Sequence, residues 1–228
     1  MNLYKTKAVV LSRTNYRETD RIISVLTPDY GKLHLIAKGV RTLKSKLAGG
    51  IELFSISDIV FIRGRGELAT LTSARLEKHF DQILNDLNKV RAGYEILKII
   101  NRVTEDEAEA AYFELLCAAL EGLNDIHLPE EVNRLWFSCH LLRVTGYAPS
   151  LAVDSAGKAF SEEGSYNFDG DNMTFVRQDQ GRYSPNHIKY LKLVFRAKNP
   201  SVLAKVVGGD GLAGELLLPI NLIQNYLH

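Results

Sequence analysis

The sequence has few cysteines and no long apolar run, and both absences exclude classes of protein. Only Cys117 and Cys139 occur, both within apolar patterns of helical period, so neither a disulfide framework nor a zinc site of four cysteines can form. No stretch of 18 or more apolar residues is present, and residues 1–20 lack the apolar core and small-residue cleavage site of a signal peptide. We therefore expect a cytoplasmic protein with no membrane partner, no cofactor and no metal site.

Common catalytic motifs are also missing. The sequence contains no P-loop of the form Gly-x-x-x-x-Gly-Lys-[Ser/Thr], no His-Glu-x-x-His and no Gly-x-Ser-x-Gly. Its six histidines are dispersed. Cys139 and His140 are neighbours on a predicted helix, so their side chains point about 100° apart and do not form a thiol–imidazole pair. These absences favour binding without catalysis over a phosphotransfer or hydrolytic enzyme.

Acidic residues are missing from one basic segment. The formal net charge is only +1, but residues 1–80 hold 14 Lys and Arg against 7 Asp and Glu, whereas residues 81–228 hold 14 against 20. Five bases and no acid lie in one short stretch, at Lys32, Lys38, Arg41, Lys44 and Lys46. Blocks of like charge repel unless a partner neutralises them, so we expect this segment to contact the phosphates of a nucleic acid. A solvated basic loop without a ligand is the alternative.

Further arginines lie in predicted turns and are candidates for secondary DNA contacts. They are Arg13, Arg17, Arg21, Arg63 and Arg65. Loops between the strands of a small barrel commonly line its binding groove. Arg17 and Arg21 could instead pair with the nearby Glu18 and Asp20. Because most aromatic residues of such a barrel belong to its core, the pattern supports binding to the phosphate backbone better than reading of bases.

The hydrophobic period changes from two to 3.6 near residue 81, which indicates an α+β fold. Residues 4–13, 20–27, 31–38, 51–63 and 67–77 are predicted strands. Five short strands fit a small OB-fold barrel, with an SH3-like barrel as the competing interpretation. We therefore predict an OB-fold nucleic-acid-binding domain at 1–80.

Residues 81–228 are predicted to form a helical domain. The expected helices span 81–103, 107–123, 129–145, 185–197, 200–207 and 212–227. Residues 147–183 are rich in Gly, Ser, Asp and Asn, and a tight-turn sequence at 169–172 predicts a small hairpin insertion or an ordered loop.

Several motifs resemble those of the RecO family of bacterial recombination mediators. A YRETDRI turn at 16–22, a GKL strand leading into AKGVR at 31–41 and an RGRGEL turn at 63–68 occur in order, at family spacing. The segment LWFSCHLLRVTGYAPSL at 135–151 is also similar to the family. The resemblance covers about residues 4–151 well and the rest loosely.

The resemblance implies an OB barrel, a helical domain and a small zinc-binding insertion. It also implies a non-enzymatic, nucleoid-associated DNA repair protein that is a monomer when alone. RecO proteins bind single- and double-stranded DNA, anneal complementary strands, and with RecR help to load RecA onto strands covered by single-strand binding protein (SSB), whose C-terminal tail they also bind. The alternative is a protein-interaction module whose basic patch binds an acidic peptide such as that tail rather than DNA.

One departure from the family concerns zinc. Many members carry two Cys-x-x-Cys pairs just after a Gly-Tyr-x-Pro segment, whereas here Val153 and Ala156 stand at the first pair and no cysteine follows. Zinc is therefore not expected, and its loss must be offset by core contacts or leave the insertion looser.

The predicted helix 129–145 is a candidate surface for the acidic SSB tail. As the family resemblance describes it, the tail ends in a hydrophobic residue with a free carboxylate, so its receptor needs an apolar pocket beside a base. Trp136 and Phe137 lie in this helix, but core packing is their more natural role. Arg134 and Arg143 are then the candidate partner-binding residues.

Overall fold

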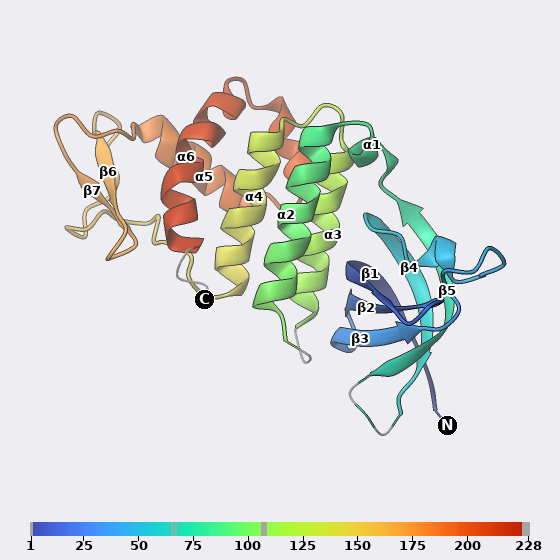
Figure 1. Cartoon of the computed structure of the whole chain (residues 1–228). Coiled ribbons are helices and arrows are strands. Elements are labelled where there is room, and N and C mark those ends of the chain that lie inside the picture. Colours follow the sequence, from blue (N-terminus) through green and yellow to red (C-terminus); the bar gives the residue numbers. More distant parts are fainter. Residues whose placement is uncertain (1, 65, 67, 106–108, 225–228) are drawn as a thin grey trace. The chain divides into compact units, whose positions relative to one another are not determined.

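The computed structural model describes residues 2–64, 66, 68–105 and 109–224, and it contains two compact units, Met1–Asn124 and Asp125–His228. In the first unit, five strands precede three helices (Figure 1): β1 (Leu3–Tyr16), β2 (Asp20–Thr27), β3 (Gly31–Ala37), β4 (Ser55–Ile62), β5 (Ala69–His79), α1 (Asp81–Leu84), α2 (Leu87–Val103) and α3 (Ala110–Asn124). The second unit contains α4 (Glu130–Val144), β6 (Tyr166–Asp169), β7 (Thr174–Arg177), α5 (Pro185–Arg196) and α6 (Gly209–Gln224). Short 3₁₀ segments occur at Ala48–Gly50 and Pro200–Lys205. The predicted α+β class is confirmed.

The five strands close into a barrel in the order β1-β2-β3-β5-β4, with β4 returning to β1. All neighbouring pairs are antiparallel except β3 and β5, which pair in parallel. This arrangement is OB-like, as the sequence predicts. Because Leu3 lies opposite Ile62 and Thr27 opposite Gly31, the β2–β3 and β4–β5 connections lie at one end of the barrel. The β1–β2 turn and the β3–β4 loop lie at the other end, which we call the loop end.

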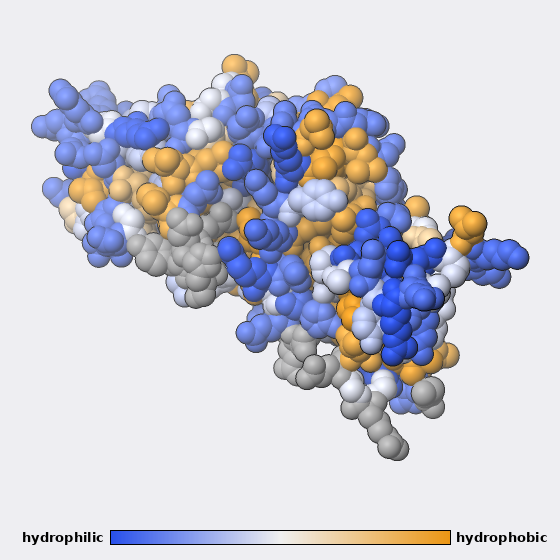
Figure 2. Space-filling model, in the orientation of Figure 1, coloured by the Kyte–Doolittle hydropathy of each residue, from blue (hydrophilic) through white to orange (hydrophobic). Residues whose placement is uncertain are grey.

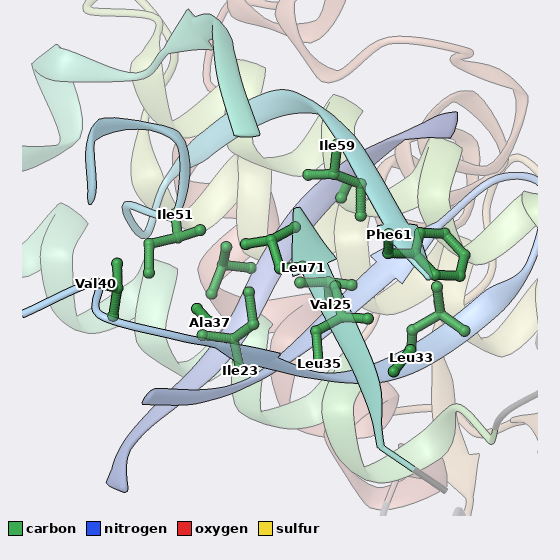
Figure 3. Packing of buried hydrophobic residues seen from close by; sticks show 13 residues of the cluster. Ile23, Val25, Leu33, Leu35, Ala37, Val40, Ile51, Ile59, Phe61 and Leu71 are labelled. Atoms are coloured by element: carbon green, nitrogen blue, oxygen red, sulfur yellow. The ribbon is translucent and has the colours of Figure 1, made fainter. Parts of the chain in front are cut away.

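The barrel core is formed by side chains that alternate along each strand, as the two-residue period of a strand requires. Ile23 and Val25 on β2 and Leu33 and Leu35 on β3 point inward with Phe61 of β4 (Figure 3). Fully burying one such side chain stabilises the fold by roughly 1.5–3 kcal/mol. This core holds the strand ends, and hence the loops, in fixed positions.

Two helices cover part of the outside of the barrel. Val9 and Leu11 are buried although they alternate with the inward-facing Val10, because α2 packs on β1 and α3 packs on β2. Residue 80 thus separates strands from helices, while the compact unit continues to Asn124. A separate domain at 1–80 stays a prediction.

In the second unit, α4 packs against α5, α6 and the Pro200–Lys205 segment. Pro129 precedes α4, whose first turn carries Glu130 and Glu131, where negative charge is favourable to the helix dipole. Gly146 ends the helix with a φ of 83°, a conformation that glycine adopts without strain. No helix in the described ranges has both the length and the apolar character needed to cross a membrane.

The insertion between α4 and α5 contains the antiparallel hairpin β6–β7 and is packed around aromatic rings. Contacts between ring centroids at 5.1–6.3 Å link Phe160, Tyr166, Phe168, Phe175 and Tyr183. Among residues 2–64, 66, 68–105 and 109–224, no group of three His, Cys, Asp or Glu side chains is placed to hold a metal ion.

Candidate nucleic-acid interface

The loop between β3 and β4 carries four exposed bases and projects from the loop end of the barrel (Figure 1). These bases are Lys38, Arg41, Lys44 and Lys46. Figure 2 shows hydrophilic side chains at the tip of this projecting loop. Leu43 is the exception, because its side chain is fully exposed among the bases. We call these four residues the basic loop.

Backbone contacts anchor the start of the basic loop to the β1–β2 turn. The N–H of Gly39 donates to Asp20 Oδ1 at 2.8 Å, and the N–H of Arg41 donates to the carbonyl oxygen of Thr19 at 2.9 Å. The Arg41 guanidinium donates to the carbonyl oxygen of Glu18 at 3.0 Å. The turn and the loop are therefore held side by side, although they are far apart in the sequence.

The electrostatics of Asp20 show the same convergence. The Gly39 N–H, followed by the Thr19 hydroxyl and the charges of Arg17 and Lys38, lowers the pKa of the Asp20 carboxyl below its ordinary value. Residues of the β1–β2 turn and residues at the start of the β3–β4 loop therefore both stabilise the charged form of the Asp20 carboxyl. Positive charge gathers here from two separate segments of the chain.

Arg17 is one of the positively charged residues at the loop end, and its backbone is constrained. Its φ of 53° lies in the left-handed region, which is uncommon for a residue with a side chain. Its guanidinium carbon lies 5.1 Å from the centre of the Tyr16 ring, in cation–π geometry. Tyr16 is itself exposed, so the loop end presents an aromatic side chain beside its basic residues.

Arg13 and Arg21 are less available for contacts with DNA than the four residues of the basic loop, because each already has a side-chain partner. Arg13 Nη1 lies 2.7 Å from Glu52 Oε2, and this ion pair offsets its charge. Arg21 Nε donates to Asn15 Oδ1 at 3.2 Å, so its partner is neither of the two acids that the sequence suggests.

Lys32 and Arg63 are away from the loop end. Lys32 Nζ donates to the carbonyl oxygen of Asn101 at 3.0 Å and also to that of Thr104, and so caps the C-terminal end of α2. The Arg63 guanidinium carbon lies 5.5 Å and 5.6 Å from the ring centres of Tyr4 and Tyr30, at the opposite end of the barrel. Arg65 lies outside the described residues. The predicted DNA-binding residues are thus not all brought together.

The candidate partner residues of α4 lie beside a buried aromatic pair. Trp136 and Phe137 are each only 2% exposed, and Trp136 Nε1 donates to the carbonyl oxygen of Ala197 at 2.7 Å. The Arg143 guanidinium donates to the carbonyl oxygen of Phe195 and lies over its ring, whereas Arg134 is half-buried. The two aromatic residues therefore serve the core rather than an exposed pocket.

The sequence reasoning missed one arrangement in the second unit. Ser184 Oγ lies 2.9 Å from His187 Nδ1, and His187 Nε2 lies 3.1 Å from Glu215 Oε2. The order resembles a nucleophile–base–acid relay, but Ser184 and His187 form a capping box at the start of α5. The sequence signals the cap through Ser184 and Pro185, whereas Glu215 is 28 residues from His187 and gives no local signal. This arrangement ties α5 to α6.

Comparisons with known proteins match almost the whole chain to one family. A family model described as the recombination protein O N terminal matches residues 1–80, and one described as the recombination protein O C terminal matches residues 84–205. The DNA repair protein RecO of Dehalococcoides mccartyi is 35% identical over 149 residues, which are 65% of this chain and 58% of that protein. The DNA repair protein RecO of a Roseiflexus species is 32% identical over 167 residues, 73% of this chain and 58% of that protein. The chain thus spans 58% of the length of these curated relatives.

Proposed function

The chain belongs to the RecO family, and we propose on this premise that it is a DNA repair protein that binds single- and double-stranded DNA without chemically altering it. The observation that carries this proposal is the basic loop, four exposed bases joined to the turn that carries Arg17. A lysine ammonium acts as a point charge toward phosphate, and an arginine guanidinium as a two-pronged donor. We assign the main DNA contacts to Lys38, Arg41, Lys44, Lys46 and Arg17.

The other predicted DNA-binding residues take secondary places in this proposal. Arg21 borders the loop end, and Arg13 keeps part of its positive field despite its ion pair with Glu52. Arg63 and Arg65 would serve only a strand that reaches the opposite end of the barrel. Lys32 is the weakest candidate, because α2 already occupies its ammonium group.

The cluster of exposed lysine and arginine side chains also supports a role in strand annealing. Two complementary strands repel each other through their phosphates, and a protein that neutralises phosphates lowers this repulsion. We propose that the protein anneals complementary strands and, with RecR, helps to load RecA onto DNA covered by SSB. RecR and the SSB tail would be protein partners, with Arg134 and Arg143 as the proposed contacts for the tail.

The second unit supports binding without catalysis. The Ser184–His187–Glu215 arrangement has the geometry of a relay, but its serine is engaged in capping α5. We therefore assign this arrangement to stability.

Strand annealing with and without SSB tests the proposal. We expect the protein to accelerate annealing of complementary oligonucleotides in both cases, and to leave the strands and added ATP intact. In a control variant, three exposed lysines of the second unit, Lys158, Lys198 and Lys205, are replaced by Ala. This variant should anneal the strands as fast as the wild type does. Annealing no faster than in buffer, or cleavage of the strands, would contradict the proposal.

Leu43 supports a second candidate function, the binding of an acidic peptide. A fully exposed leucine among bases suits a peptide that combines carboxylates with a terminal hydrophobic residue. An SSB-tail peptide that displaces DNA from the wild type, and fails to bind a Leu43→Ser variant, would favour this candidate.

The predicted tail contacts at Arg134 and Arg143 are tested by reversing both charges, which should weaken peptide binding and leave binding to naked DNA intact.

A further inference from the structure

A groove of ≈ 410 Å³ lies within the first unit, between residues 11–13 of β1, the segment before β4 and helix α2. Leu11, Leu53 and Leu97 supply its apolar lining, and Tyr94 and Lys98 border it. Its volume falls in the range of sites that accept small molecules or parts of larger ones. Leu53 belongs to the same β3–β4 connection as the basic loop, so the groove and the candidate DNA surface share one segment of chain.

Tyr94 is held in place as an aromatic platform. Its side chain is 51% exposed, yet its ring meets the ring of Phe54 edge to face, with 5.3 Å between the centroids and 77° between the planes. An exposed ring that is already held by a neighbouring ring loses little conformational freedom when a second flat group stacks on it. The contact therefore prepares Tyr94 for stacking.

Phe54, which contacts the Tyr94 ring, is itself unusual. Phe54 is 1% exposed and has a φ of 56°, a left-handed conformation that is strained for a bulky residue. Its ring approaches Gly93 so closely that a Cβ atom there would lie 2.6 Å from it. Strained backbone persists where the surrounding structure enforces it, and such positions cluster at binding sites.

The charge at the groove suits a phosphate. Lys98 follows Tyr94 by four residues on α2, so the two side chains lie on the same face of the helix. Lys98 is exposed and makes no ion pair with any residue that the structure describes. Arg13 also lines the groove but is paired with Glu52, so Lys98 supplies the available positive charge.

We propose that this groove holds an unpaired nucleobase of single-stranded DNA, stacked on Tyr94, with a neighbouring phosphate at Lys98. The proposal rests on the proposed function and deepens it. A duplex keeps its bases stacked inside and cannot place one in the groove, whereas a single strand that leaves the basic loop can do so. An acidic peptide with several carboxylates fits less well, because the groove lining offers it one base, Lys98, that makes no described ion pair, while Arg13 is paired with Glu52. The groove would therefore favour single strands over duplex.

The test compares Tyr94→Ala, Tyr94→Phe and a control, Leu87→Ala, in the full chain. Leu87 is 75% exposed on the same helix and does not line the groove. We expect Tyr94→Ala to weaken binding of a labelled single-stranded oligonucleotide by about 5- to 150-fold. Tyr94→Phe should bind almost as the wild type does, and none of the three variants should change the affinity for duplex. The fluorescence of 2-aminopurine in the single strand should be quenched on binding to the wild type, and among the three variants only Tyr94→Ala should lose this quenching.

Lys98→Gln keeps the proposal testable if Tyr94→Ala unfolds. This exposed substitution should reduce the magnitude of the salt slope for single strands by about 0.7 and leave the duplex slope unchanged. If the wild type binds no DNA at all, the proposed function fails, and the groove proposal fails with it. If the wild type binds single strands and Tyr94→Ala binds them equally well, only the groove proposal is overturned. It is also overturned if Tyr94→Ala no longer binds an acidic peptide while keeping both forms of DNA.

Discussion

Lys32 lies in the basic segment, but its ammonium group holds the C-terminal end of α2 through the carbonyl oxygens of Asn101 and Thr104. Lys32→Met should therefore lower the free energy of unfolding by about 1–3 kcal/mol, because it leaves these acceptors without their donor. Denaturation by urea measures this decrease. The matched variant Lys38→Met should keep its stability, since Lys38 is exposed.

The same two variants distinguish a lysine that stabilises the fold from a lysine that binds DNA. The slope of DNA affinity against salt should be unchanged in Lys32→Met, and smaller in magnitude by about 0.7–0.9 in Lys38→Met. If Lys32→Met unfolds at the same urea concentration as the wild type and has a reduced salt slope, Lys32 binds DNA rather than capping the helix.

Asp20 predicts a pH dependence of the loop end. Its carboxylate accepts the Gly39 N–H, and its pKa in the folded protein is lowered below the ordinary value. The stabilisation is therefore fully present above the ordinary carboxyl pKa of about 3.9, and it is lost as the pH falls through the lower folded-state value. The Asp20→Asn variant should be less stable than the wild type at pH 7, and the difference should shrink toward pH 3. A difference that stays constant over this range would contradict the assignment.

Among the elements, the hairpin β6–β7 depends on aromatic packing where many family members are expected to use zinc. Phe175 is fully buried among Phe160, Phe168 and Tyr183. Phe175→Ala should cost about 3–5 kcal/mol of stability, in the range typical for truncation of a buried phenylalanine. A chelator should leave the melting temperature of the wild type unchanged. Zinc near one equivalent by elemental analysis would overturn this account of the insertion.

Most elements could be predicted because their signals are local. β-branched runs between turn residues indicated the five strands, and apolar residues at helical spacing indicated the helices. The predicted helix at 81–103 is in fact broken, because Asp86 caps a new helix by accepting the N–H of Asn88. Residues 200–205 form a 3₁₀ segment that the periodicity does not distinguish from an α-helix.

The site was less predictable because its key contacts join distant residues. Lys32 and Asn101 are 69 residues apart, so no sequence window shows that Lys32 caps α2, the helix that contains Asn101. Tyr94 lies in an ordinary helical pattern, and only the fold brings the Phe54 ring into contact with it. The exposed bases of the basic loop were predictable, since a run of like charge is visible in the sequence itself.

For the molecule as a whole, the fold concentrates positive charge at one end of the barrel. The β1–β2 turn and the basic loop converge there, and Lys32 and Arg63 lie toward the other end. The excess of acid in residues 81–228 falls mainly outside the barrel. We therefore expect a polyanion to be attracted to the loop end rather than to the chain at large.

The most direct test of this account is the salt dependence of DNA binding when Lys38, Arg41, Lys44 and Lys46 are all replaced by Ala. Each of these side chains that binds a phosphate in the wild type should, when removed, reduce the magnitude of the log–log slope by about 0.7–0.9, and the melting temperature should stay near that of the wild type. The matched control replaces one arginine and three lysines of the second unit, Lys158, Arg177, Lys198 and Lys205, and should keep the wild-type slope. A basic-loop variant with an unchanged slope would show that DNA binds elsewhere and would contradict the central claim.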